Sequence, residues 1–223
     1  ELVLRLTPGH AKARTIGSIA HMPGAVITFA VVHALQQVAS VKPERVQIIT
    51  NAEVTKLLTS GSKVCGLEYK KGGETSTLKG SVIMASGGYA GENSAGSLLA
   101  KHCPGLLSLP MTSDERSDGA GIKLSTAVGA ACEKLNKVNL CPMGAIMPKD
   151  PNADFKIVIS DAICGAGGKL LNADGARFVD ELASSSTRVE AMTKSKPPFR
   201  LVIKEVDSQT VQWLVDFYSK RGI

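Results

Sequence analysis

Residues 165–182 constrain the fold of this chain most, because they join a glycine pair, an apolar triplet and a tight turn. The triplet 169–171 is a strand candidate, and Asp174-Gly175 supplies the positive φ that a hairpin turn needs. Residues 177–179 are expected to form the returning strand, and the serines after Leu182 favour a helix start. The stretch therefore predicts a β-hairpin that leads into a helix. On pattern alone, a purely structural hairpin is an equal alternative.

The composition of this 223-residue chain fits a protein with one large or two small domains, since 43% of its residues are hydrophobic and 21% are charged. Only 4% are aromatic, which argues against nucleic-acid modules that stack bases on aromatic side chains. The net charge of +6 contains no long run of like charges. It indicates either a solvated basic surface or a site for anionic ligands, and no nucleic-acid partner is expected.

The cysteines are odd in number, and none lies in a Cys-x-x-Cys pair; they are Cys65, Cys103, Cys132, Cys141 and Cys164. No disulfide framework or metal site is therefore expected. An intracellular, reducing compartment is favoured, such as the cytosol, a mitochondrion or a glycosome-like organelle. We expect no membrane span, because no apolar run is judged to reach about 18 residues. The start at Glu1, without a methionine, reads as part of a longer polypeptide.

Hydrophobic periodicity predicts a long helix over residues 25–39 and an antiparallel meander over residues 53–58, 64–70 and 76–79. Further strands are expected at 46–50, 81–85, 157–163 and 199–206, and further helices at 94–100, 121–129 and 208–221. Strands alternating with helices favour an α/β fold, which becomes α+β in the second part of the chain.

Glycine-rich turns mark the candidate ligand-binding segments. The first, Ala85-Ser86-Gly87-Gly88, follows a buried strand candidate, and paired glycines let the backbone approach a flat or phosphorylated ligand closely. An ordinary strand-to-loop turn is the alternative. The second segment runs from Pro8 to Thr15. The third, residues 117–121, precedes a predicted helix, and Asp118 there is interpreted as a turn or capping residue.

Together these motifs resemble the FAD-dependent fumarate reductase and succinate dehydrogenase flavoproteins, and most closely the soluble, single-chain fumarate reductases of fungi and trypanosomatids. The string Gly-Gly-x-Leu-Leu-Asn-x-x-Gly-x-Arg-Phe-Val-x-Glu-Leu is similar to the hairpin of their capping domain. The resemblance covers nearly the whole chain, as the middle of a longer flavoprotein. It implies a partial flavin-binding domain over residues 1–138 and a truncated capping domain over residues 139–223.

The resemblance implies FAD as the cofactor and a small dicarboxylate as the substrate. It assigns contacts with FAD to His10, Arg14, Thr15, Val54, Ala85, Ser86, Gly87, Gly88 and Gly119. Without the resemblance, Val54 is interpreted as a core residue and His10 as a loop histidine without a ligand.

The active-site positions depart from the family. Its substrate histidine, one substrate arginine and its proton-donor arginine correspond to Cys141, Cys164 and Ser185. Both thiols are expected to be buried and inert. The family's Thr-Glu pair corresponds to Ser160 and Asp161, which the resemblance therefore assigns to substrate binding.

Arg188 is the candidate replacement for the lost donor. It lies three residues beyond Ser185, on the same face of a helix, but displaced by about 4.5 Å along the axis. Arg188 and Asp161 are accordingly the two candidate catalytic residues.

The sequence therefore predicts a fumarate-reductase-like oxidoreductase with degraded active-site positions, and leaves open whether it is an active enzyme. The alternative is a catalytically silent homologue that binds a ligand or protein partner. Neither the family's Gly-x-Gly-x-x-Gly turn nor its C-terminal substrate arginine occurs in these 223 residues. The chain alone is therefore expected to be inactive, with the missing segments of a longer polypeptide as its partners.

Overall fold

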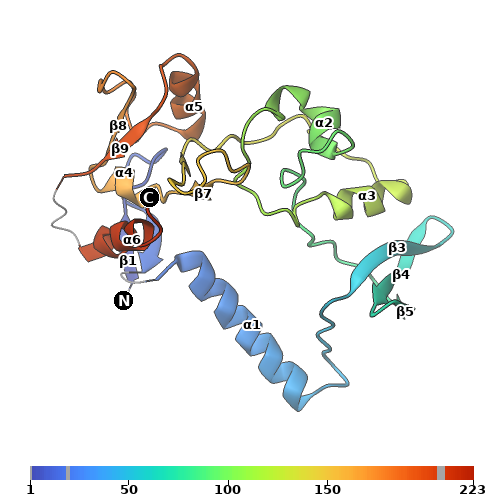
Figure 1. Ribbon diagram of the computed structural model, residues 1–223. Helices are drawn as coiled ribbons and strands as arrows, with labels where there is room; N and C mark the ends of the chain where they lie inside the picture. Colours follow the sequence, from blue (N-terminus) through green and yellow to red (C-terminus); the bar gives the residue numbers. More distant parts are fainter. Residues whose placement is uncertain (1, 19–20, 205–208) are drawn as a thin grey trace. The chain divides into compact units, whose positions relative to one another are not determined.

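The computed structural model describes residues 2–18, 21–204 and 209–223 (Figure 1). Contacts divide the chain into two compact units, which are described separately. The first unit holds residues 1–33 and 139–223, and the second holds residues 34–138. Helix α1, Pro23–Val41, begins in the first unit and ends in the second. The chain contains both helices and strands, which agrees with the predicted α/β class as far as the mixture of elements is concerned. The division into flavin and capping domains at residue 138 stays a prediction.

The second unit contains the predicted meander. Strands β3 (Glu53–Ser60), β4 (Lys63–Lys71) and β5 (Glu74–Lys79) pair antiparallel in that order. The turns between them contain Gly61, Gly72 and Gly73, all with positive φ. Because two-residue hairpin turns require such backbone angles, glycine punctuation located this sheet correctly from sequence.

Short helices complete the second unit: α2 (Leu98–His102), the 3-10 turn η1 (Pro104–Leu106) and α3 (Ala120–Ala127). Helix α2 begins later than predicted, because the Ser97 hydroxyl caps it by accepting a hydrogen bond from the Ala100 N–H at 3.0 Å. The Asp118 carboxylate accepts from the Ala120 N–H at 2.8 Å, so the turn interpretation of Asp118 is confirmed.

Two predicted strands, 46–50 and 81–85, are wrong. Both segments are irregular, and Ile83 has 91% of its surface exposed. Their β-branched residues favour an extended backbone, but a strand also needs a neighbour to pair its N–H and C=O groups. Within the described ranges, neither segment pairs with another strand.

The described residues of the first unit form three two-stranded antiparallel sheets. They pair β1 (Leu2–Arg5) with β2 (Thr15–Ser18), β6 (Gly144–Ala145) with β7 (Ile157–Val158), and β8 (Lys169–Leu171) with β9 (Arg200–Val202). Its remaining helices are α4 (Ala162–Gly165), α5 (Ser185–Thr193) and α6 (Gln209–Ser219). The strand predicted at 157–163 is therefore only two residues long and gives way to α4. Residues 205–206 and 208 of two predicted elements lie outside the described residues.

The hairpin prediction for residues 165–182 is correct in its turn, but its pairing is confirmed only at the bridge between Leu171 and Arg177. The Asn172 side-chain oxygen accepts from the Ala176 N–H at 2.9 Å, as in a tight turn, but residue 177 makes a single bridge instead of a strand. Strand β8 pairs with β9 instead (Figure 1). The N–H of Leu170 donates to the Glu181 carboxylate at 2.9 Å. A side chain therefore supplies the acceptor that was expected from the backbone of the return strand.

The core of the first unit lies between α4 and α6. Its buried members are Ala162, Ile163, Val211, Leu214 and Tyr218. A second cluster, Met143, Cys164 and Leu170, continues this core toward β8. Helix α4 contributes to both clusters, so its position is fixed from two sides.

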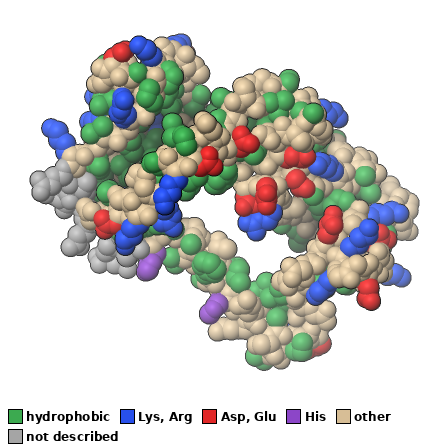
Figure 2. All heavy atoms as spheres, in the orientation of Figure 1, with side chains coloured by type: hydrophobic (Ala, Val, Ile, Leu, Met, Phe, Trp, Pro, Cys, Tyr) green, Lys and Arg blue, Asp and Glu red, His purple; other side chains and the backbone are tan. Residues whose placement is uncertain are grey.

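Helix α1 corrects the expectation of no membrane-length run. It has 19 residues with a mean hydropathy of 1.5, so by length and composition it is apolar enough to cross a membrane. None of it is buried, and hydrophobic side chains are exposed along it (Figure 2). Core helices of soluble proteins and N-terminal signal sequences meet the same criterion.

Candidate functional site

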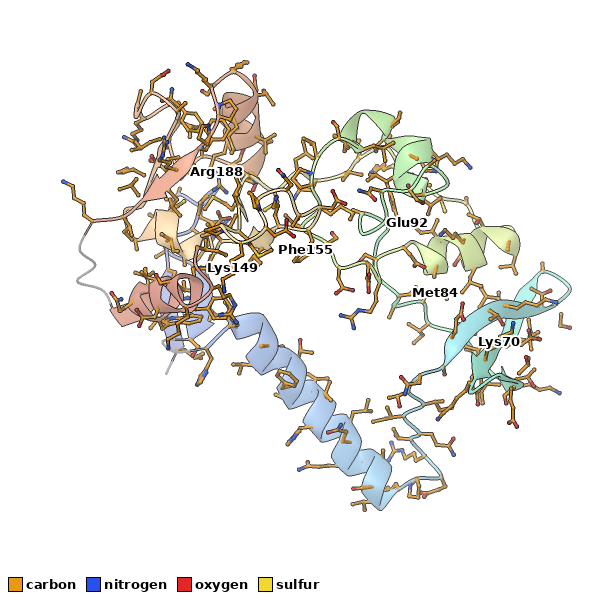
Figure 3. All side chains as sticks on the ribbon, viewed as in Figure 1. Lys70, Met84, Glu92, Lys149, Phe155 and Arg188 are labelled. Carbon is orange, nitrogen blue, oxygen red and sulfur yellow. The ribbon has the colours of Figure 1, made fainter. Side chains whose placement is uncertain are left out.

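The central feature of the site is an ion pair between Asp161 and Arg188 of α5, the second of which is labelled in Figure 3. The Arg188 Nη1 donates to Asp161 Oδ1 at 2.9 Å. The arginine side chain is 0% exposed, whereas the aspartate side chain is 40% exposed. The Nε and Nη2 groups of Arg188 have no hydrogen-bond partner among the described residues. A buried guanidinium therefore retains donors for a further acceptor.

Two short helices position this pair. The Ser184 hydroxyl caps α5 by accepting from the Thr187 N–H at 3.2 Å, and Arg188 follows one turn later. The N–H of Ser160 donates to the Tyr218 hydroxyl at 2.9 Å, while the Ser160 hydroxyl accepts from the Ala162 N–H at 3.3 Å. Since Tyr218 belongs to the core, Asp161 is held by a rigid segment. The structure thus brings together Ser160, Asp161 and Arg188, which the sequence had nominated separately.

The two substituted thiols differ. Cys164 is buried with Met143 and Leu170, as predicted, but Cys141 is exposed, so that prediction is wrong. Cysteine is buried on average, but Cys141 lies in a loop outside both clusters. Burial raises the pKa of the Cys164 thiol to about 11, although the neighbouring Arg188 cation partly opposes the shift.

The raised pKa of Cys164 predicts a loss of stability in alkali. A thiol whose pKa is higher in the folded protein stabilises it fully below its ordinary pKa of about 9, and this contribution disappears as the pH approaches 11. Between pH 8 and 10.5 the free energy of unfolding should therefore fall by about 1–2 kcal/mol more in the wild type than in Cys164→Ala. Urea unfolding at both pH values measures the difference. Cys141→Ala, at the exposed thiol, should behave like the wild type; an unchanged slope in Cys164→Ala would contradict the expectation.

Glu181 is a buried carboxylate of the hairpin motif for which no role was predicted from the sequence. Its side chain is 2% exposed and binds Arg177 through Oε2 and Nη2 at 2.6 Å. Burial acts to raise the pKa of Glu181, but hydrogen bonds from Arg177 and the Leu170 N–H outweigh it, so the pKa is lowered.

The loop that carries the predicted flavin residues His10, Arg14 and Thr15 packs, within the first unit, beside the segment that precedes α5. The N–H of Gly9 donates to the Leu182 carbonyl at 2.8 Å. Inside the loop, Arg14 Nε donates to His10 Nδ1 at 2.9 Å, and the Thr15 and Thr7 hydroxyls lie 2.7 Å apart. Residues separated by most of the chain therefore meet at one place.

Gly165 is required for this close approach, because a Cβ there would overlap the carbonyl oxygen of Leu6. We predict that Gly165→Ala lowers the free energy of unfolding by about 1–3 kcal/mol, since the obstacle is backbone and cannot rotate away. Gly96→Ala is the matched control, because no atom lies within 4 Å of its added Cβ. Chemical denaturation of both variants measures the difference; equal midpoints would show that the loop moves freely.

The second unit brings together most of the remaining predicted FAD residues. The Gly119 N–H donates to the Gly88 carbonyl at 3.0 Å, and a Cβ at Gly121 would overlap the Ser86 hydroxyl. Gly119 and Gly87 have φ values of +76° and +80°. No atom lies within 4 Å of an added Cβ at Gly87 or Gly88. This open, exposed glycine backbone suits close approach by a flat cofactor.

Ala85 lies at the exposed start of the same turn. Val54 lies apart from it, half-buried in β3. A hollow beside it is lined by Asn51, Ala52, Glu53, Lys70, Gly72 and Gly73. Val54 therefore lies in a strand, and its contact with FAD stays a prediction.

A model of the FAD binding domain family matches residues 1–209. The chain belongs to this family. The fumarate reductase of Schizosaccharomyces pombe is 36% identical over 220 residues, which are 96% of this chain and 43% of that protein. Fumarate reductase 1 of Saccharomyces cerevisiae is 30% identical over 193 residues, which are 85% of this chain and 40% of that protein. The predicted resemblance and the predicted cofactor, FAD, are thereby confirmed.

Among solved structures, the open conformation of a flavocytochrome c3 fumarate reductase superposes with a TM-score of 0.66. The match covers 99% of this chain and 37% of that one, at 21% sequence identity. At this identity the match establishes a shared fold. The chain spans less than half the length of the two curated yeast relatives and of this structure.

Proposed function

We propose that this chain forms the central part of a FAD-dependent reductase of unsaturated carboxylates. A small dicarboxylate, the substrate implied by the resemblance, is the first candidate. Two relatives are named fumarate reductases, and the chain keeps a cation at the corresponding segment. We further propose residues 1–138 as part of the flavin domain and residues 139–223 as part of the capping domain.

The buried guanidinium of Arg188 carries this proposal. Burying a cation is costly unless its charge is paired and its N–H groups are bonded. Asp161 takes one Nη1 bond, and the Nε and Nη2 groups have no protein acceptor among the described residues. Adjacent guanidinium N–H groups match the two oxygens of a carboxylate. A substrate carboxylate would satisfy these N–H groups once the residues around the buried guanidinium move apart, because the side chain has no exposed surface in this structure.

The chemistry divides between the cofactor and this chain. FAD, when bound, supplies the hydride for the reduction. Arg188 would orient the substrate carboxylate and give a proton to the carbon next to it. Asp161 keeps the guanidinium in place and, being 40% exposed, connects this buried group with water for its reprotonation.

This chain's own residues would hold FAD at two places. The glycine backbone of 85–88 and Gly119 would meet the nucleotide, and His10, Arg14 and Thr15 would lie near the reactive ring. The loop that carries these three side chains is bonded to the segment before Arg188, through Gly9 and Leu182. The five free cysteines support an intracellular, reducing compartment.

A catalytically silent homologue is the second candidate. It is favoured by Cys141, Cys164 and Ser185 at positions where the family has two arginines and a histidine. Such a protein would use the same scaffold to bind a ligand or a partner without turnover.

The test is anaerobic oxidation of a reduced dye by the FAD-loaded, full-length polypeptide that contains these residues, with fumarate and a series of unsaturated monocarboxylates as acceptors. Turnover of any of them at about 1 per second or faster would support a reductase. If FAD binds and none of the acceptors oxidises the dye, the silent homologue is the better description.

A further inference from the structure

The buried carboxylate of Glu181 has no part in the proposed mechanism, but its contacts lie around the proposed proton donor. Its side chain is 2% exposed. One oxygen, Oε1, accepts from the Leu170 N–H at 2.9 Å and from Arg177 Nε at 3.0 Å. The other, Oε2, accepts from Arg177 Nη2 at 2.6 Å, and Lys169 Nζ lies 3.8 Å from it. The carboxylate therefore joins β8 and the turn that follows it to the segment that precedes α5.

The packing around Leu170 connects Glu181 with Arg188. Leu170, whose N–H the carboxylate binds, lies in one buried cluster with Cys164. Burial raises the pKa of the Cys164 thiol, and the Arg188 cation opposes that shift. The carboxylates of Asp161 and Glu181 act in the same direction as burial. Since charges shift a pKa mainly at short range, these three charged groups lie close to the same part of the core.

The backbone between Glu181 and Arg188 has little freedom to move. The Leu182 N–H donates to Asp180 Oδ1 at 3.1 Å, as in a tight turn. Ser184 then caps α5, and its carbonyl accepts from the Arg188 N–H at 3.0 Å. A shift of the Glu181 carboxylate would therefore move the start of α5, and Arg188 with it.

The same segment contacts the loop that is proposed to lie near the reactive ring of FAD. The carbonyl of Leu182, the residue after Glu181, accepts from the Gly9 N–H at 2.8 Å. Gly9 directly precedes His10, the first of the three loop residues proposed for this ring. Glu181 therefore lies between the loop proposed for the flavin and the residue proposed as the proton donor.

We propose that Glu181 is a positioning residue for proton transfer by Arg188. Its carboxylate, bound by Arg177 and the Leu170 N–H, fixes the start of α5 and thereby the distance from the Arg188 guanidinium to the substrate carbon. This inference rests on the proposed function, because only a reductase uses that distance. A buried ion pair is often no more stabilising than apolar packing, whereas its directional hydrogen bonds restrict geometry. The alternative is an ion pair that holds the fold together without affecting catalysis.

Glu181→Gln tests the inference in the FAD-saturated, full-length polypeptide that contains these residues. Glutamine keeps an oxygen acceptor for the Leu170 N–H but loses the charge that binds Arg177. The kcat should fall about 10- to 100-fold, because a misplacement of about 1 Å can cost that much. The KM should change less than about three-fold, since ionic attraction weakens gradually with distance. The acceptor is fumarate, or the unsaturated monocarboxylate that the wild type reduces fastest.

The solvent deuterium isotope effect on kcat separates positioning from a merely structural role. It should rise in Glu181→Gln, because a misplaced donor makes proton transfer limit the rate. A structural role would only lower the amount of active enzyme, which leaves the isotope effect at its wild-type value. Wild-type kcat in the folded variant, or a lower kcat with an unchanged isotope effect, would overturn the inference.

Glu190→Gln is the matched control on α5. Glu190 also forms an ion pair, with Lys194 Nζ at 2.6 Å, but its side chain is 66% exposed. Its replacement should leave both kcat and the isotope effect unchanged, because an exposed pair contributes little. A fall in kcat with a raised isotope effect in this variant as well would show that any lost charge on α5 disturbs Arg188, and would overturn the specific role of Glu181.

A double variant covers the case in which Glu181→Gln does not fold. Arg177→Gln/Glu181→Gln leaves neither member of the pair charged, so no charge is buried without its partner. It should show the same fall in kcat and the same rise in the isotope effect, and wild-type values would overturn the inference. Absence of turnover in the wild type would contradict the proposed function and the inference with it. Wild-type turnover that these variants leave unchanged would overturn the inference alone.

Discussion

Replacing Arg188 with glutamine is expected to lower the turnover of an unsaturated carboxylate by the FAD-loaded protein about 10²- to 10⁴-fold. Glutamine retains hydrogen-bond donors but removes the charge and the acid, and loss of a general acid typically costs this much. The substrate carboxylate also loses its charged partner, so its affinity should fall together with the maximal rate. The measurement is steady-state oxidation of a reduced dye, with kcat and KM determined separately.

Two controls distinguish the loss of a catalytic group in Arg188→Gln from misfolding of the variant. Arg200→Gln changes the same side chain at an exposed position on β9, and it should leave turnover unchanged. The double variant Asp161→Asn/Arg188→Gln removes both charges of the pair and should unfold at a higher temperature than Arg188→Gln alone, since no carboxylate is left unpaired. If Arg188→Gln is folded and keeps the wild-type kcat, Arg188 is not the proton donor.

Local signals predicted the local part of the fold. The meander β3–β5 follows from alternating strands and from glycines that allow positive φ, all within one short stretch. The hairpin at 165–182 was only half right, because its pairing depends on β9, some thirty residues downstream, and on the buried carboxylate of Glu181. The apolar stretch 81–85 has the composition of a strand, but pairing depends on neighbours that composition does not identify.

For the candidate site, the residues were predicted from the sequence, whereas their contacts were not. Arg188 and Asp161 were nominated from motif register, but their 2.9 Å contact joins residues 27 apart in sequence, which no local pattern reveals. The side chain of Arg188 is fully buried, and its Nε and Nη2 groups have no hydrogen-bond partner among the described residues, which depends on tertiary packing and not on a local pattern. Cys141 was wrongly predicted to be buried, because cysteines are buried on average but this one lies in an exposed loop.

Restoring the lost family positions is expected to create or raise fumarate reduction at least 100-fold in the double variant Cys141→His/Ser185→Arg. Both positions accept larger side chains, since Cys141 is exposed and Ser185 is half-buried at the first turn of α5. Cys164 is left unchanged because it is buried beside Arg188, where a second guanidinium would meet a like charge without solvent. The wild type is expected to reduce fumarate far below an ordinary enzyme rate of about 1–10³ per second.

The position of the added cation decides the outcome. Ser186→Arg, combined with Cys141→His, is the matched control, because it adds the same charge one residue later on an exposed part of the same helix turn. One residue on a helix rotates a side chain by about 100°, since a turn takes 3.6 residues, so this arginine should point away from the site. A long-range effect of charge would raise the rate equally in both double variants, whereas proton donation needs placement within about 1 Å. The prediction is contradicted if the wild type already reduces fumarate at an ordinary rate, or if the rate rises equally in both double variants. In either case the absence of an arginine at position 185 does not limit catalysis, and Arg188 alone performs the family's proton transfer.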